Sequence, residues 1–361
     1  MPKANEKNAR IKRVYFRYLR EAMRRDERSI DVVARALVRF EEATRHKDFA
    51  TFNQEQAVAF KRRLADQVSK ATAHTTLAAL KGFFHWLAGR TGYRSKLTYA
   101  DADYFNLSEK DVRIAKASLP KVFPSLQQLH HVLATVPATT AVEKRDRALI
   151  ACALLTGARD GALRSLRLKH VKLAECRVDQ DAREVATKNA KSFPTWFFPV
   201  GGNALAIFED WCSYLRTELL WCDNDPLFPA TKVAPDADGV FAPQGLLRSG
   251  WRSTGPVRAV FRRAFEVAGL PYFHPHSVRH TLGQFGEQIC PTIESFKAWS
   301  QNLGHAGVLT TLNSYGTVTP HRQAILIRTA GQPKAAAGLT ADQLAVLQNL
   351  IAQQGGMVPL S

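Results

Sequence analysis

Apolar residues recur at helical spacing through the first third of this chain, and that periodicity constrains its fold more than any other feature. The spacing appears in two runs: Ile30, Val33, Leu37 and Phe40, and then Leu77, Leu80, Phe84 and Leu87. Residues three and four apart lie on one face of a helix, so each run predicts an amphipathic helix. Ser29 is the predicted N-cap of the first helix. A third helix is predicted across Phe60 and Leu64, and no strand-like alternation occurs in this part.

Residues 115–124 contain two prolines and no apolar period, which predicts a connection between two domains. The chain is divided accordingly into four parts: a helical domain at 1–117, a linker at 118–124, a second domain at 125–328, and a flexible segment with a C-terminal helix at 329–361. The start of that last helix is marked by Thr340 and Gln343, which have the spacing of a capping box.

The second domain is predicted to combine helices with one small sheet. Ser125 precedes a helical run as its expected cap, and an apolar run at 148–155 stops at Gly157, as buried helices often do. Residues 183–200 are predicted to form two strands joined by a short turn, with Pro194 placing the second strand at a sheet edge. The fold class is therefore mainly α with a small β-sheet, and two more helices are expected at 205–215 and 257–265.

A large positive charge indicates the kind of partner. The 361 residues include 50 Lys and Arg against 32 Asp and Glu, for a net charge of +18. The part before Ser118 holds 25 basic and 14 acidic residues and carries +11, so the remainder carries +7. A surplus of this size indicates a polyanionic partner bound through phosphate neutralisation, and nucleic acid is the first candidate.

Composition also argues against several other classes. No stretch approaches the roughly 18 consecutive apolar residues of a membrane span, and the basic N-terminus lacks the apolar core of a secretory signal. We expect a cytoplasmic protein with no membrane partner. Five cysteines without a CxxC pair favour reduced thiols over disulfides or structural zinc. The chain has no Walker-type glycine loop and no GxGxxG, so nucleotide-driven chemistry has no support.

Four short patterns hold the candidate functional residues. They are Thr-Gly-Ala-Arg159, the turn lysine Lys188 with Lys191 beside it, His274-Pro-His276-Ser-Val-Arg279-His280, and Leu-Gly-His305 followed by Tyr315. Each is weak alone, but the residue types suit a phosphodiester under attack. Two guanidiniums can bind its non-bridging oxygens, and an ammonium can protonate the departing oxygen. A phenol becomes a nucleophile in such a positive field when histidines can accept its proton.

The order Arg…Lys…His-x-x-Arg…His…Tyr resembles the tyrosine recombinase (phage-type integrase) family. The resemblance covers residues 122 to 328, and more loosely 13–117, where Thr76 to Leu87 resemble the family's helical core-binding domain. It implies that this DNA-binding domain precedes a mixed α/β catalytic domain. It also implies a site-specific DNA recombinase or integrase, acting for a mobile genetic element.

The resemblance implies a role for each residue. Tyr315 would attack the scissile phosphate to form a 3′-phosphotyrosyl link and free a 5′-hydroxyl. Arg159 and Arg279 would hold the phosphate oxygens. Lys188, rather than Lys191, matches the lysine that acts as general acid towards the 5′ oxygen.

His276 and His305 are implied to assist proton transfer and transition-state stabilisation, and no cofactor or metal is required. Two departures from the family pattern affect the local geometry. Ala162 stands where the family commonly has an acidic residue that supports the first arginine, with Asp160 nearer. Ten positions separate His305 from Tyr315, one more than the commonest spacing. The remaining histidines of the cluster are expected to be structural: His274 and His280.

The implied partner is double-stranded DNA with specific recombination sites, on which the family assembles as a homotetramer. An accessory directionality protein is a further expected partner, and the cytoplasmic nucleoid is the expected location. The C-terminal helix would either dock on a neighbouring protomer or cover its own domain, through an apolar face formed by Leu344, Leu347 and Ile351.

Two other classes stay open at this point. A type IB topoisomerase uses nearly the same catalytic set but relaxes plasmids that lack any particular site. A metal-dependent hydrolase would instead use the histidines as ligands, and a chelator would inhibit it.

Overall fold

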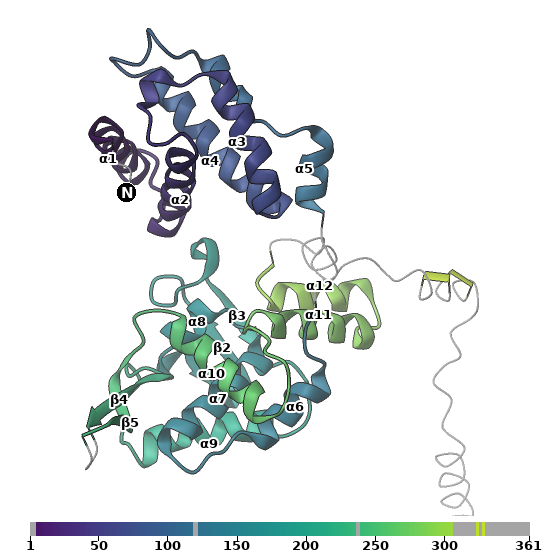
Figure 1. Ribbon diagram of the computed structural model, residues 1–361. Coiled ribbons are helices and arrows are strands. Elements are labelled where there is room, and N and C mark those ends of the chain that lie inside the picture. The colour runs from purple at the N-terminus through teal and green to yellow at the C-terminus, as the bar shows by residue number, and fades with distance from the viewer. Residues whose placement is uncertain (1–4, 118–121, 236–238, 306–322, 325–326, 329–361) are drawn as a thin grey trace, which may run out of the picture. The chain divides into compact units, whose positions relative to one another are not determined.

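A computed structural model describes residues 5–117, 122–235, 239–305, 323–324 and 327–328 (Figure 1). The chain divides into two compact units between Leu119 and Pro120, and each unit has its own hydrophobic core. Within the described residues, no helix is long and apolar enough to cross a membrane. Tyr315 and the predicted C-terminal helix lie outside these residues.

The first unit is helical throughout its described part, as predicted. Its elements are α1 (Glu6–Glu21), α2 (Glu27–Ala43), the 3-10 helix η1 (Phe49–Thr51), α3 (Gln54–Gln67), α4 (Lys70–Ala88), η2 (Tyr99–Phe105) and α5 (Glu109–Lys116). One predicted cap is wrong. The N-cap of α2 is Asp26, whose carboxylate accepts the backbone N–H of Ser29 at 2.8 Å, so Ser29 lies inside the helix. The predicted connection also begins later than residue 115, because α5 continues to Lys116.

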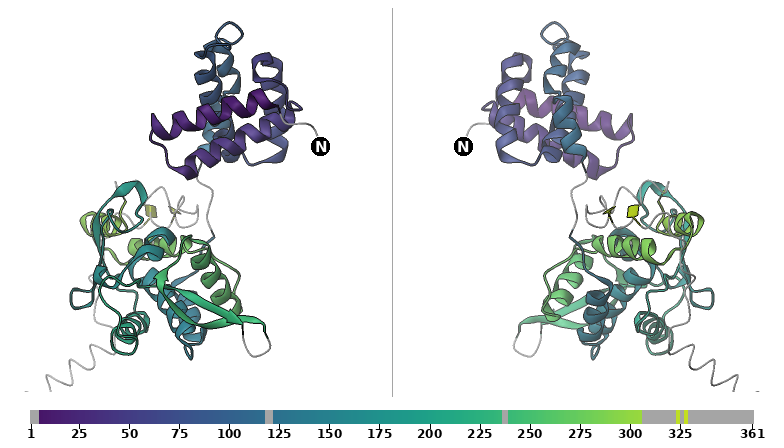
Figure 2. Two further views of the ribbon diagram at one scale, coloured as in Figure 1. Left: turned by 90° about the vertical axis from the view of Figure 1, so that its left-hand side faces the viewer. Right: turned by 90° about the vertical axis from the view of Figure 1, so that its right-hand side faces the viewer.

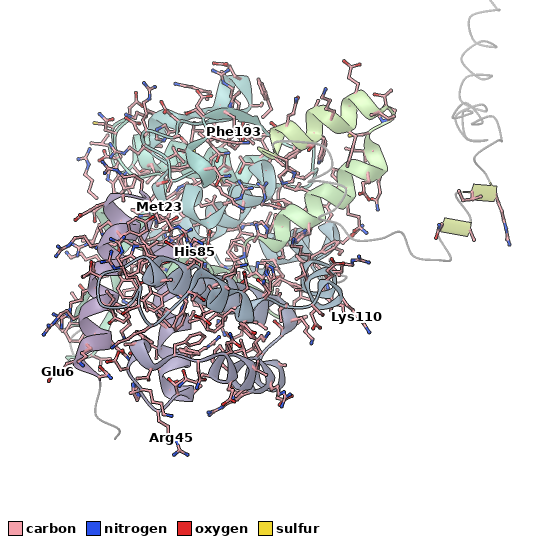
Figure 3. The ribbon with its side chains drawn as sticks, turned by 90° about the horizontal axis from the view of Figure 1, so that it is seen from above. Glu6, Met23, Arg45, His85, Lys110 and Phe193 are labelled. Carbon is pink, nitrogen blue, oxygen red and sulfur yellow. The ribbon has the colours of Figure 1, made fainter. Side chains whose placement is uncertain are left out.

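Contacts between aromatic rings run through the core of the first unit. Phe84 of α4 is 1% exposed, and its ring centroid lies 4.3 Å from that of Phe52, 5.2 Å from that of Phe105 and 5.4 Å from that of Phe40. The apolar positions that predicted α2 and α4 are all buried in this core. Most charged side chains lie on the outside, as Figure 3 shows for Lys110, whereas Glu41 is buried.

The second unit contains the remaining described helices. They are α6 (Leu126–Thr135), α7 (Ala141–Thr156), α8 (Asp160–Ser165), α9 (Ala204–Thr217), α10 (Gly255–Val267), α11 (Ser277–Ile289) and α12 (Ile293–Asn302), with 3-10 turns η3 (Leu168–His170), η4 (Leu173–Glu175) and η5 (Lys188–Ala190). The predicted cap Ser125 is confirmed, because its hydroxyl accepts the N–H of Gln128. The stop at Gly157 is confirmed as well, since that residue closes α7 in the left-handed conformation.

The sheet near the candidate residues differs from its prediction. It has three antiparallel strands in the order β1 (Val171–Lys172), β2 (Arg177–Gln180) and β3 (Phe193–Trp196). The prediction of an edge strand at Pro194 is therefore confirmed. The strand predicted to begin at Arg183 is wrong, because β2 ends at Gln180. The Asp181 side chain accepts the N–H of Arg183 and its carbonyl accepts that of Val185, so the chain turns there.

A second sheet was not predicted. Strands β4 (Pro229–Pro235) and β5 (Phe241–Gly250) pair antiparallel with shifted register. Figure 2 shows them as a ribbon that extends from the helices of this unit. Prolines within both strands obscure the alternation by which a strand is recognised.

Candidate active site

Arg159 stands at the junction of two helices in the second unit. It is the N-cap of α8, three residues after the end of the buried helix α7, as predicted. Gly157 makes this close turn with a φ of 59°, and a Cβ placed there would lie 2.7 Å from Leu303 Cδ2. Glycine is therefore required both for the backbone conformation and for the close approach. Desolvation lowers the pKa of the half-buried Arg159 guanidinium, which nevertheless stays charged at neutral pH.

Arg279 is the most deeply buried of the predicted site residues, with 4% of its surface exposed. It lies in the first turn of α11, which begins at Ser277 as predicted. Its Nη1 donates to the carbonyl of Gly157 and its Nη2 to that of Leu303, so the guanidinium joins segments from the two ends of the unit. Nη2 also lies 3.0 Å from His305 Nε2.

The protonation state of His305 follows from that contact. An arginine has only donors, so the Nε2 atom facing Arg279 acts as an acceptor and the ring is neutral. Burial lowers the pKa of His305 to about 4, and the positive charges of Arg279, Arg159 and Lys188 act in the same direction. His305 therefore lies in the combined field of these three predicted site cations.

His276 precedes Arg279 by three residues. It is the N-cap of α11 and keeps an exposed edge, while its ring packs at 5.3 Å against that of the buried His280 and at 6.1 Å against that of His274. The pKa of His276 is lowered to about 3. Desolvation by burial is the largest cause, and the charges of Arg279, His280 and Arg159 lower the pKa in the same direction. Both predicted histidines thus belong to one electropositive cluster.

Lys188 is exposed and is the first residue of η5, in the connection between β2 and β3. The structure therefore brings five of the six predicted residues into one cluster, through contacts or through charge: Arg159, Lys188, His276, Arg279 and His305. Tyr315 lies outside the described residues.

Asp160 has a different partner from the one considered in the sequence. Its carboxylate binds Arg258 of α10, with Oδ2 at 2.9 Å from Nη2 and 3.2 Å from Nε. The ion pair fixes the start of α8 to α10. Sequence reasoning missed Arg258, because it belongs to no motif and lies 98 residues from its partner.

The histidines do not form a metal site in the part of the chain that the structure describes. No group of three or more His, Cys, Asp or Glu side chains there is arranged to hold a metal ion. Within the same residues the five cysteines are free thiols.

Comparison with known proteins identifies the class that this arrangement belongs to. Residues 125–322 match the phage integrase family, and residues 13–91 match the N-terminal SAM-like domain of phage integrases. The first match alone covers more than half of the chain. The chain therefore belongs to the phage integrase family and is a tyrosine recombinase. The predicted family resemblance is confirmed.

Individual relatives agree with this assignment. Tyrosine recombinase XerC of Ralstonia pickettii is 27% identical over 252 residues, which span 68% of this chain and 69% of the relative. A lambda integrase dimer bound to a COC′ core site has a TM-score of 0.57 at 16% identity, covering 84% of this chain and 96% of the other. The Tn1549 transposon integrase in complex with a circular intermediate DNA has a TM-score of 0.55 at 16% identity, covering 88% and 98%. These structural likenesses show the fold, and the predicted fold class is confirmed.

Proposed function

We propose that this chain cuts and rejoins double-stranded DNA at specific sites through a 3′-phosphotyrosyl intermediate on Tyr315. The observation that carries the proposal is the buried guanidinium of Arg279. The carbonyls of Gly157 and Leu303 and the ring of His305 hold it in place. A cation fixed in this way before the substrate arrives can stabilise a developing anion without reorganising.

In the proposed cleavage step, the phenolic oxygen of Tyr315 attacks the scissile phosphorus and the bond from phosphorus to the 5′ oxygen breaks. The phosphate stays on the 3′ end, now joined to the tyrosine. Arg159 and Arg279 bind the non-bridging oxygens of the dianionic transition state through charge-assisted hydrogen bonds. Lys188 donates its proton to the departing 5′ oxygen.

The proton of Tyr315 passes to a neutral imidazole in the same proposal. His276 and His305 are both neutral at pH 7 because their pKa values are lowered. Burial and the cationic field lower these pKa values, and the phosphate offsets the field when DNA is bound. His276 is the proposed acceptor, because Nε2 of His305 already accepts from Arg279. Rejoining is the reverse reaction, in which a 5′-hydroxyl attacks the phosphotyrosine. The bond energy is kept throughout, so the chain's own side chains suffice and no cofactor is needed.

One pair of assays tests this function against the topoisomerase alternative. A recombinase joins DNA ends only when paired recombination sites are present, and Tyr315→Phe binds those sites without forming a covalent complex. A topoisomerase relaxes supercoiled plasmids that carry no site. Site-independent relaxation without joining by the purified protein would contradict the proposal, as would a covalent complex formed by the phenylalanine variant.

We further propose that four copies assemble on two DNA sites and that the predicted helix at 340–353 docks on a neighbouring protomer. A groove of about 580 Å³ between β3 and α12 supports this proposal. Its lining includes Phe193, Trp196 and Trp299, and none of the described residues that line it is charged. Trp196 is 51% exposed. The apolar face of the helix matches this lining: Leu344, Leu347 and Ile351.

Deleting residues 336–361 tests the docking. The truncated chain should bind a single duplex site normally and lose assembly and recombination. A matched variant, Trp196→Ala, should reduce assembly in the full chain. Full recombination by the truncated protein would show that the helix does not dock in trans.

The biological setting is proposed from the similarity of this chain to known recombinases. The similarity to a transposon integrase supports action for a mobile genetic element, assisted by an accessory directionality protein, at the nucleoid in the cytoplasm. Sequencing the DNA ends that the purified protein joins tests this setting, because ends of an integrated element are expected and two copies of a chromosomal site would contradict it.

A further inference from the structure

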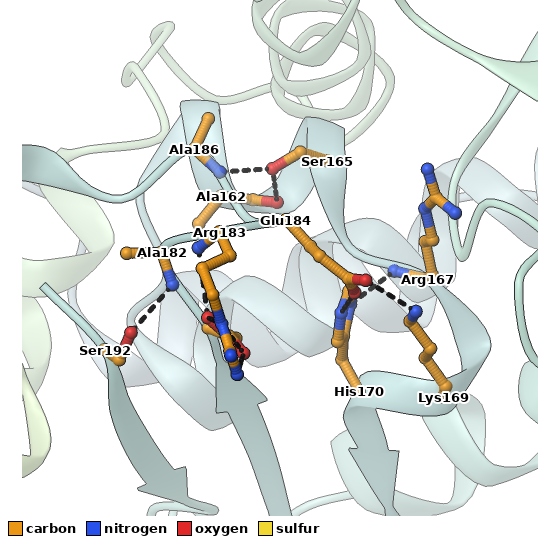
Figure 4. A network of polar contacts seen from close by, with 11 residues as sticks. Ala162, Ser165, Arg167, Lys169, His170, Ala182, Arg183, Glu184, Ala186 and Ser192 are labelled. Atoms are coloured by element: carbon orange, nitrogen blue, oxygen red, sulfur yellow. Dashed lines mark hydrogen bonds and ion pairs between the residues drawn. The ribbon is translucent and has the colours of Figure 1, made fainter. Parts of the chain in front are cut away.

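A polar network attaches the connection between β2 and η5 to the helix that begins beside Arg159 (Figure 4). The backbone N–H of Ala186 donates to the hydroxyl of Ser165 at 2.8 Å. The same hydroxyl donates to the carbonyl of Gly161 at 3.0 Å. Ser165, the last residue of α8, therefore uses its hydroxyl as acceptor and donor at once, and it ties the connection to its own helix.

A second attachment lies two residues earlier in the connection. Nδ1 of His170 accepts the backbone N–H of Arg167 at 2.9 Å, so the proton of a neutral ring is on Nε2. That Nε2–H donates to Glu184 at 2.9 Å, and Lys169 Nζ lies 2.8 Å from the other carboxylate oxygen. His170 is only 5% exposed, which makes this contact costly to leave unsatisfied.

Packing brings the same segment against α8. Val185 is buried in the core of the unit. A Cβ at Gly161 would lie 3.0 Å from the carbonyl oxygen of Ala186, so the glycine permits the close approach. At the far end of the connection, the N–H of Ala182 donates to Ser192 at 2.9 Å.

These attachments fix the starting point of Lys188. Consecutive Cα atoms are about 3.8 Å apart, so the Cα of Lys188 lies within about 8 Å of that of Ala186. Arg159 caps the other end of the six-residue helix α8, roughly 9 Å from Ser165 along the axis at about 1.5 Å per residue. Ala186 contacts this helix at both Gly161 and Ser165, so two of the cluster's cations are connected to one short helix.

We propose that Ser165 and the Glu184–His170 pair are positioning residues for Lys188. Ser165 holds the base of its connection against α8 and the Glu184–His170 pair holds it against η3, so that the ammonium reaches the departing 5′ oxygen of the phosphate that Arg159 binds. The inference rests on the proposed function, because it concerns the general acid of that reaction. The three residues themselves do not touch the DNA in this account.

DNA with a 5′-bridging sulfur at the mapped scissile phosphate tests the inference. A thiolate leaves without being protonated, because a thiol is a far stronger acid than an alcohol. Lys188→Ala should therefore cut ordinary DNA about 10²- to 10⁴-fold more slowly, the contribution of a general acid, and cut the sulfur substrate nearly normally. Ser165→Ala and Glu184→Ala should show the same pattern with a smaller loss, on the order of tenfold on ordinary DNA.

Two further variants distinguish a loss of Lys188 positioning from a general loss of structure. Glu184→Gln keeps an oxygen that accepts the His170 Nε2–H, and it should restore most of the activity that Glu184→Ala loses. Thr217→Ala removes a hydroxyl that donates to the carbonyl of Ser213 within α9, and it should cut both substrates at the normal rate.

The inference fails if Ser165→Ala and Glu184→Ala lose activity equally on both substrates, or cut ordinary DNA at the normal rate. Failure of the proposed function looks different. In that case the unaltered chain forms no covalent complex with either substrate, or sulfur does not rescue Lys188→Ala.

Discussion

The two units of this recombinase differ in what they bury. The first unit packs aromatic rings around Phe84, and its buried carboxylate Glu41 is neutralised by Lys12. The second unit buries a core of both aliphatic and aromatic side chains, and with it the cations Arg145 and Arg279 and the histidines His170 and His280. A buried cation is expensive unless it is paired, so its presence needs a structural or a functional reason.

The second unit supplies one example of each reason. Arg145 binds the carboxylate of Asp146, and it also donates to the carbonyl of Pro229 and the hydroxyl of Thr231, which ties α7 to β4. Arg279 is held instead by the carbonyls of Gly157 and Leu303 and by the ring of His305. The difference teaches that Arg145 completes the fold, whereas in the proposed function Arg279 binds the phosphate of the DNA.

The largest effect is expected from the aromatic core. Phe84→Ala removes a ring that packs against Phe52, Phe105 and Phe40 and should lower the free energy of unfolding of the first unit by about 3–5 kcal/mol. Denaturant titration followed by near-UV circular dichroism measures the loss. A loss well below 1 kcal/mol would show that this core is loosely packed and would weaken the contrast between the units.

The next effect is chemical. Arg159→Ala should raise the barrier to cleavage by about 3–4 kcal/mol, roughly 10²- to 10³-fold in rate, by analogy with other preorganised donors to an oxyanion. Its thermal stability and its DNA affinity should change little. Single-turnover cleavage of a nicked site measures the rate, and Lys191→Ala serves as a control for the loss of a nearby positive charge. Normal cleavage by the Arg159 variant would remove this residue from the site.

Arg145→Met tests whether the other buried arginine serves stability and not cleavage. The change leaves Asp146 with Arg263 as its remaining ion-pair partner, and it should cost about 3 kcal/mol of stability, the lower end of the range for a broken buried pair. Cleavage by the protein that remains folded should be normal. A variant of normal stability but slow cleavage would reverse the roles assigned to the two buried arginines.

The smallest effect concerns pH. The folded pKa values of His276 and His305 are lowered to about 3 and about 4, against about 6.5 in an unfolded chain. Between these values the unfolded state binds more protons, so the free energy of unfolding falls as the pH is lowered from 6.5 towards 4. The partly exposed edge of His276 limits its share of this loss.

Proton NMR of the two rings measures the same property directly in the DNA-free protein. Their signals should keep the positions of neutral imidazoles down to pH 5. Replacing both histidines with asparagine should flatten the pH dependence of unfolding. Titration of either ring near pH 6.5 would mean that the cationic cluster is absent in solution.

The sequence predicted those parts of the molecule whose signals are local. Apolar faces at helical spacing located α2, α4 and α6, and the glycine stop located the end of α7. The strand predicted at Arg183 failed because Val185 contributes an apolar side chain to the core from a turn that Asp181 forms. The local sequence pattern cannot distinguish a turn that buries one apolar residue from a strand.

Contacts between residues far apart in the chain could not be predicted from local sequence patterns either. The residues of the candidate cluster could be named from their order in the chain. Their partners could not, because the carbonyl of Gly157 and the guanidinium of Arg279 are 122 residues apart. The Asp160–Arg258 ion pair likewise depends on how α8 packs against α10.

The central claim is tested most directly by identifying the amino acid that becomes joined to DNA. The purified protein is trapped on a nicked substrate and digested, and the linked peptide is sequenced by mass spectrometry. The account predicts one peptide, with Tyr315 joined to the 3′ end of the cut strand. A link through another residue such as Tyr272, or attachment to the 5′ end, would contradict it.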